Sequence, residues 1–120
     1  MKKILICDDD EVLLATIRVR LTEDNLGEIF LARDGLQALN LLREQDYDLV
    51  ITDIHMPYHN GDEVLNFIRV EQRKNTPIVM ISTDAAEEVK ALAKKMGVNE
   101  FITKPAKPKE VSRLVRRLLQ

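Results

Sequence analysis

The chain of 120 residues has few of the features that mark secreted, membrane or nucleic-acid-binding proteins. Its one cysteine, Cys7, cannot form an internal disulfide, which indicates a reducing compartment. It has no tryptophan and 4% aromatic residues, which argues against a stacking surface for single-stranded nucleic acid. No apolar run approaches the roughly 20 residues that a membrane span needs. We therefore expect a cytoplasmic protein with no membrane partner.

The charges of the chain are nearly balanced, with 18 Lys and Arg against 20 Asp and Glu and a formal net charge of -2. This balance gives no general attraction to nucleic acid, so we expect no direct nucleic-acid binding. Hydrophobic residues at 45% and charged residues at 32% are ordinary for a globular domain. The length favours one domain over residues 1–120.

Strands are predicted at five short apolar runs: 4–7, 29–32, 49–51, 78–81 and 101–102. None of these runs alternates with polar residues, which is typical of parallel strands that are covered on both faces. The stretches that follow them carry apolar residues at helical spacing: Leu14, Ile17, Leu21, Ala38, Leu39, Leu42, Val64, Phe67, Ile68, Val89, Leu92, Ala93, Met96, Val111, Leu114, Val115 and Leu118. The pattern predicts a doubly wound α/β fold of five βα units, with helices on both faces of one sheet.

Polar residues gather where the predicted strands end: Asp8, Asp9, Asp10, Thr52, Asp53, Ser82, Thr83, Thr103 and Lys104. If the strand order is 2-1-3-4-5, the first and third strands are neighbours, and Asp8, Asp9 and Asp53 converge at the carboxyl edge of the sheet. Carboxylates brought together repel one another and need a cation. Oxygen ligands without a Cys or His cluster favour Mg²⁺, with Mn²⁺ as an alternative.

A further carboxylate at such a site can act as a nucleophile toward phosphorus. Lys104 would supply a positive charge for phosphoryl oxygens, and Ser82 a hydroxyl donor. Phosphoryl transfer needs little more than positioning and charge neutralisation. The residues therefore suffice for phosphoryl transfer.

This set closely resembles the receiver domain of two-component response regulators, of the single-domain, chemotaxis-regulator-like kind. The resemblance rests on Asp8-Asp9, Asp53-Ile54-His55-Met56-Pro57 with Gly61, Ser82, and Lys104-Pro105, and it covers essentially the whole chain. It implies a flavodoxin-like fold of strand order 2-1-3-4-5. It also implies a switch, rather than a turnover enzyme, that takes a phosphoryl group from a histidine kinase or a histidine phosphotransfer protein. The implied surface for a downstream protein target is the fourth helix, the fifth strand and the last helix.

The resemblance also implies a role for each site residue. Asp53 is the phosphoacceptor, Asp9 a direct Mg²⁺ ligand, Asp8 a direct or water-mediated ligand, and the His55 backbone carbonyl a further ligand. Ser82 and Phe101 form the switch pair, Lys104 contacts the phosphoryl group, and Pro105 follows a cis peptide bond.

Two positions depart from the usual family pattern. Thr83 stands in place of Ala or Gly, which predicts narrower access to the phosphoryl group, and Ala106 stands in place of Phe. His55 and Asp84 should flank the path of the hydrolytic water, and we expect their side chains to pair.

The first helix has a second apolar stripe, formed by Val12, Ala15 and Val19. A helix packed on a sheet needs only one such stripe, so this one is predicted to be exposed and to dock a kinase helix bundle.

Three other readings stay open at this point. An aspartyl-phosphate hydrolase of the haloacid dehalogenase type would use the spacing of Asp8 and Asp10, but leaves the motif around Asp53 unexplained. A flavin carrier of the same topology would need a hydroxyl- or Gly-rich phosphate loop where this chain has aspartates. The chain is also compatible with a receiver excised from a longer DNA-binding or enzymatic regulator.

Overall fold

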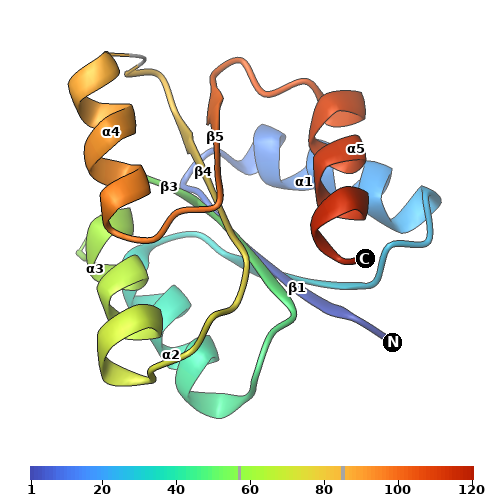
Figure 1. Cartoon of the computed structure of the whole chain (residues 1–120). Coiled ribbons are helices and arrows are strands. Elements are labelled where there is room, and N and C mark those ends of the chain that lie inside the picture. The colour runs from blue at the N-terminus through green and yellow to red at the C-terminus, as the bar shows by residue number, and fades with distance from the viewer. Residues whose placement is uncertain (57, 85) are drawn as a thin grey trace.

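The computed structural model describes residues 1–56, 58–84 and 86–120, and it contains a parallel sheet of order β2-β1-β3-β4-β5 (Figure 1). The strands are β1 (Lys3–Cys7), β2 (Glu28–Ala32), β3 (Leu49–Asp53), β4 (Ile78–Ser82) and β5 (Glu100–Thr103). The helices are α1 (Glu11–Glu23), α2 (Gly35–Glu44), α3 (Gly61–Asn66), α4 (Glu87–Lys95) and α5 (Pro108–Leu118). The predicted fold class and strand order are confirmed.

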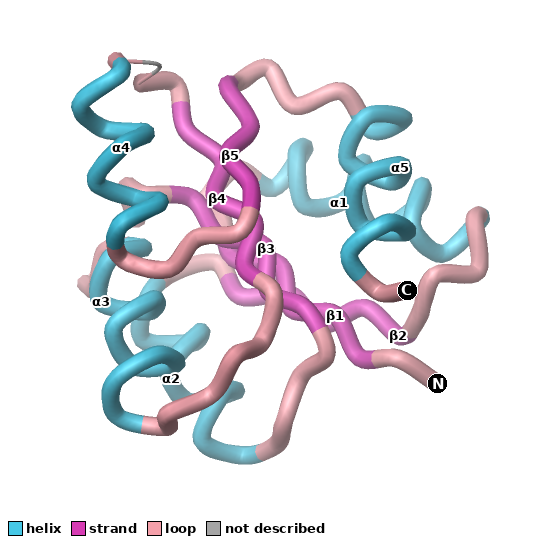
Figure 2. The backbone as a smooth tube through the Cα atoms, in the orientation of Figure 1, coloured by secondary structure: helices cyan, strands magenta, loops and turns pink. Residues whose placement is uncertain are grey.

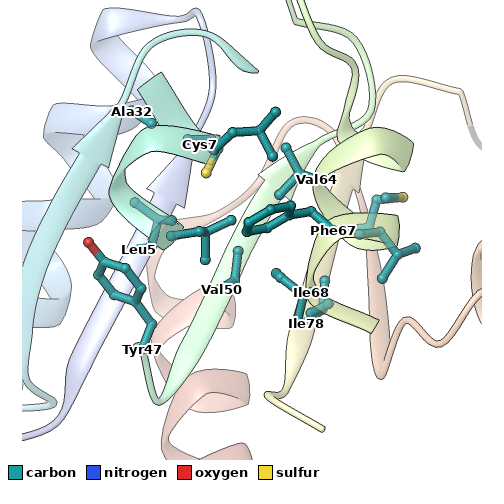
Figure 3. Packing of buried hydrophobic residues seen from close by; sticks show 14 of the residues in the cluster. Leu5, Cys7, Ala32, Tyr47, Val50, Val64, Phe67, Ile68 and Ile78 are labelled. Carbon is teal, nitrogen blue, oxygen red and sulfur yellow. The ribbon is translucent and has the colours of Figure 1, made fainter. Parts of the chain in front are cut away.

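Helices cover both faces of the sheet, with α2, α3 and α4 on one face and α1 and α5 on the other (Figure 2). Along β1, Leu5 and Cys7 point into the core under α2 and α3, whereas Ile4 and Ile6 point into the core under α1 and α5. Both sets are buried, which explains why this strand has no polar alternation. Figure 3 shows side chains of β1 and β3 packed against Phe67 in the first of these cores.

Asp10 caps the N-terminus of helix α1: its carboxylate accepts hydrogen bonds from the backbone N–H groups of Val12 and Leu13 at 3.0 and 3.2 Å. The predicted core residues of the helix are buried. The second stripe is exposed as expected, with Val12 75% and Val19 51% accessible. The helix therefore leaves an apolar strip in solvent beside the carboxyl edge of β1.

Helix α3 does not continue regularly. It passes into a π-helical turn, η1 (Phe67–Glu71), which the sequence pattern did not predict. From this turn the guanidinium of Arg69 donates hydrogen bonds to the backbone oxygens of Gly97 (3.2 and 2.9 Å) and Lys74 (2.9 Å), and to Asn99 Oδ1 (3.1 Å). Arg69 thus joins the end of α3 to the segment between α4 and β5.

Helix α4 buries little of its surface. Of its residues only Ala93 is buried, and Leu92, which has the spacing of a core residue, is 59% exposed. The helix ends before Gly97, whose φ of 104° is a conformation that favours glycine. Helix α4 therefore leaves one large apolar side chain, Leu92, mostly in solvent.

Candidate functional site

The acidic cluster forms where β1 and β3 end side by side. Cys7 pairs with Thr52 in the register of these strands, so the next residues, Asp8 and Asp53, reach the same edge of the sheet. One ligand oxygen from each of Asp8, Asp9 and Asp53 lies within 4.8 Å of the others. Asp8 and Asp53 are buried and Asp9 is exposed. The predicted convergence of the three carboxylates is therefore observed.

Lys104, the residue directly after β5, completes the cluster. Its Nζ lies 2.9 Å from Asp53 Oδ2 and 3.0 Å from Asp8 Oδ2. Burial alone would lower the pKa of Lys104, but hydrogen bonds and charge contacts with the two carboxylates outweigh it and raise the pKa. Its backbone N–H donates to Ser82 O at 2.8 Å, and the Lys104–Pro105 peptide bond is cis. The ammonium is therefore charged and fixed between two carboxylates.

Asp8 occupies the least favourable position for a charge. Burial raises its pKa and the nearby charge of Asp53 adds to this, against the hydrogen bond from the Asp10 N–H and the contact with Lys104. Among the described residues, Asp8 Oδ2 is buried without a well-aligned hydrogen bond, although Lys104 Nζ lies 3.0 Å away. A buried, under-coordinated oxygen in an all-oxygen set fits a hard divalent cation such as Mg²⁺.

The predicted switch residues lie on the adjoining strands. Ser82, at the end of β4, is buried, and its Oγ accepts a hydrogen bond from the Asp84 N–H at 3.0 Å. Phe101, on β5, is half-buried against the core beneath α2, α3 and α4. Met80, two residues before Ser82, pairs with Phe101 in the sheet register. The two residues therefore lie on neighbouring strands.

The expected pairing of His55 with Asp84 is not observed among the described residues, and this expectation needs correction. Asp84 Oδ1 accepts a hydrogen bond from the Ala86 N–H at 3.0 Å, so the carboxylate binds the backbone two residues along the chain, just before α4. His55 is exposed and lies two residues after Asp53. Its backbone N–H donates to Asp53 Oδ1, with the nitrogen 3.4 Å from that oxygen. Both residues line one cavity beside the site, and within the described part of the chain no hydrogen bond or ion pair joins them.

A cavity of about 380 Å³ adjoins Lys104 on the α1 side of the site. It is lined by Asp10, Leu13, Thr83, Lys104, Pro105 and Ala106. The two positions that depart from the family pattern, Thr83 and Ala106, therefore border the same opening, and a larger side chain at either would narrow it.

Gly61 has a role in the site that its sequence position alone did not explain. A Cβ atom at Gly61 would lie 2.1 Å from the backbone oxygen of Asp53, closer than any real contact. The Gly61 N–H also donates to Ile54 O at 2.7 Å. Glycine thus allows α3 to begin directly against the strand end that carries Asp53. Pro57, another motif residue, lies outside the described residues.

The fold and the acidic edge define a doubly wound α/β domain with a carboxylate and lysine pocket at the strand ends. The family model for the response regulator receiver domain matches residues 4–116, and the chain belongs to this family. Receiver domains act in phosphorelay signal transduction of two-component systems, and nothing in the comparisons favours the hydrolase or flavin-carrier readings.

Sequence relatives include both transcriptional and chemotaxis regulators. The chain is 32% identical over 120 residues to the transcriptional regulatory protein CpxR of Escherichia coli, covering 100% of this chain and 50% of CpxR. It thus spans half the length of that relative. It is 38% identical over 104 residues to the chemotaxis protein CheY-3 of Vibrio cholerae, covering 86% of this chain and 80% of the relative.

Solved structures agree with the fold. The receiver domain of the Francisella response regulator 1452 superimposes with a TM-score of 0.92 at 31% identity, covering 99% of this chain and 97% of the other. The chemotaxis response regulator CheY4 of Vibrio cholerae gives a TM-score of 0.87 at 30% identity, covering 99% of each chain. Within the described part of this chain, no helix has the length and apolar character to cross a membrane.

Proposed function

We propose that Asp53 is the residue that accepts the phosphoryl group from a phosphohistidine of a histidine kinase or phosphotransfer protein. The observation that carries this proposal is the Lys104 ammonium, which lies 2.9 Å from Asp53 Oδ2 inside the acidic cluster. Both carboxylate oxygens of Asp53 have a donor nearby: Lys104 Nζ lies 2.9 Å from Oδ2 and the His55 backbone nitrogen 3.4 Å from Oδ1. The bond from phosphorus to the imidazole nitrogen breaks, its electron pair returns to that nitrogen, and a bond from phosphorus to one carboxylate oxygen of Asp53 forms.

The side chains of Asp8, Asp9 and Asp53 and the backbone carbonyl of His55 would hold Mg²⁺, with Mn²⁺ as an alternative. When bound, the ion neutralises charge on the phosphoryl oxygens. Lys104 adds a second positive charge, and the Ser82 hydroxyl a donor. The buried Asp8 Oδ2, which has no well-aligned hydrogen bond among the described residues, supports this assignment, because a cation would coordinate it.

The phosphorylated domain is a switch rather than a turnover enzyme. A phosphoryl group on Asp53 draws the Ser82 hydroxyl toward it, and Phe101 responds on the neighbouring strand. The surface of α4, β5 and α5 then changes its affinity for a downstream protein target. Hydrolysis returns the domain to its resting state, at a rate set by water access past Thr83.

The exposed stripe of Val12, Ala15 and Val19 on α1 supports docking of the phosphodonor, because it flanks the carboxyl edge of β1. We assign the protein to the cytoplasm, with no membrane partner and no direct nucleic-acid contact by residues 1–120. These residues form one receiver domain.

Phosphorylation with a small acyl phosphate tests the central assignment. In the presence of Mg²⁺, the protein should gain one acid-stable, base-labile phosphoryl group, detected as a mass increase. Asp53→Asn should abolish the increase, while the control Asp46→Asn, at an exposed carboxylate, should keep it. Equal labelling of Asp53→Asn would overturn the proposal.

A further inference from the structure

A cavity of about 290 Å³ opens between α3 and α4, which lie next to each other on one face of the sheet (Figure 1). Its walls are mainly apolar and comprise Ile54, Leu65, Met80, Val89, Leu92, Ala93 and Met96. Pockets for drug-sized ligands usually have volumes of about 300–1,000 Å³. This cavity lies just below that range, so a single large side chain is a suitable occupant. The output surface assigned above, on α4, β5 and α5, does not include its α3 wall.

The polar residues that line this cavity are His55, Asn60, Asp62 and Asp84. Two of them are carboxylates, and no lysine or arginine occurs among the described lining residues. The first turn of α4 carries two more exposed carboxylates, Glu87 and Glu88, outside the cavity lining. The opening therefore favours a cationic partner.

The opposite side of α4 has the reverse character. A smaller groove there, of about 210 Å³, is lined by Lys90 and Lys94 of α4 together with Val98, Asn99, Glu100 and Phe101. One helix thus separates an acidic, apolar cavity from a groove with two lysines. A basic partner would select the α3 side of α4, because the lysines repel it from the other side.

Apolar side chains at the rim complete the surface. Leu92 is 59% exposed and Val89 is half-buried, and both line the cavity. An inserted side chain would fill the cavity, while the apolar face of its helix covered Leu92. This is the arrangement by which an amphipathic helix binds a groove through an anchor residue.

We propose that the cavity between α3 and α4 is the docking site for a basic amphipathic helix of a partner protein. The helix inserts one aromatic or large aliphatic side chain between Leu65 and Ala93 and places lysines or arginines beside Asp62 and Asp84. This site lies apart from the phosphodonor stripe on α1. It shares α4 with the output surface of the proposed function and differs from it by the wall that α3 contributes.

A synthetic amphipathic peptide with one central Phe, flanked by lysines on the same face, tests the proposal against the full unphosphorylated chain. The outcome is therefore independent of whether Asp53 accepts a phosphoryl group. Amide shifts in NMR spectra should concentrate on the cavity walls, at Ile54, Leu65 and Ala93. Replacing the peptide's Phe with Ala should weaken binding by about tenfold or more. Replacing its lysines with glutamates should abolish binding.

Two protein variants locate the contact. Asp62→Lys should weaken peptide binding by about tenfold. Glu110→Lys makes the same charge change at an exposed position of α5 and should leave peptide binding unchanged. Val89→Phe fills the cavity without altering the rim charge, and it should remove the advantage of the Phe peptide over its Ala version. Melting curves establish that each variant is folded.

The proposal is overturned if the peptide does not bind, or if its shifts map to α1 or to β5 and α5. It is also overturned if Glu110→Lys weakens binding as much as Asp62→Lys, because binding would then follow net charge alone.

Discussion

Removing the carboxylate of Asp9 should abolish the response of the protein's stability to Mg²⁺ while leaving the metal-free fold intact. Asp9 is the exposed member of an acidic cluster whose ligand oxygens lie within 4.8 Å of one another. The Lys104 ammonium contacts Asp8 and Asp53, and Asp9 has no ion pair among the described residues. The negative charge of Asp9 is therefore not neutralised by a paired cation.

The magnitude follows from the geometry. At 4.8 Å, the largest separation among these ligand oxygens, two unit charges repel by about 0.9 kcal/mol in water. Exposure and salt screen part of this repulsion. Asp9→Ala should thus leave the free energy of unfolding of the metal-free protein unchanged, or raise it by up to about 1 kcal/mol. At about ten times its dissociation constant, Mg²⁺ should stabilise the unaltered protein by about 1.4 kcal/mol, because it binds only the folded state.

Urea unfolding with and without Mg²⁺ measures both effects. Asp9→Ala should show no difference between the two conditions. Glu23→Ala, which removes an exposed carboxylate at the other end of α1, should keep the full response to Mg²⁺. A clearly lower stability of metal-free Asp9→Ala, or an undiminished response of this variant to Mg²⁺, would refute the reasoning.

Three further predictions concern other parts of the structure. Arg69→Lys should lower the free energy of unfolding in urea by about 2 kcal/mol, since an ammonium cannot reproduce the forked hydrogen bonds; full retention of stability would contradict this. Hydrogen bonds from Ser112 and Arg20 hold the pKa of Asp24 below its ordinary value of 3.8. Ser112→Ala should therefore destabilise the protein at neutral pH and lose this effect as pH falls through the lowered pKa; a difference in melting temperature that persists in acid would disprove it. Under the proposed function, Thr83→Ala should speed loss of the phosphoryl group by up to about tenfold, and an unchanged or slower time course would argue against a steric role.

The sequence predicts the sheet well because burial on both faces leaves a simple signal. Along β1, both Ile4 and Leu5 are inaccessible to solvent, so a continuous apolar run is the only composition that suits the strand. The carboxyl ends of β1 and β3 then meet through the strand order. The clustering of Asp8 and Asp53 could therefore be predicted without knowing any side-chain geometry.

Features that depend on competing local partners could not be predicted in the same way. The Asp84 carboxylate had two possible partners, the His55 imidazole and the Ala86 N–H two residues along the chain, and it accepts a hydrogen bond from the Ala86 N–H. The π-helical turn that carries Arg69 leaves no signature in the apolar spacing, because the predicted core residues Phe67 and Ile68 are buried there as they would be in an α-helix.

The most direct test of the central claim is to identify the phosphorylated side chain chemically. The protein is phosphorylated with a small acyl phosphate and Mg²⁺, then treated with borohydride, which reduces an aspartyl phosphate to the corresponding alcohol. Peptide mass spectrometry locates the altered residue. The account predicts reduction at Asp53 alone; reduction at Asp8 or Asp10 instead would contradict it.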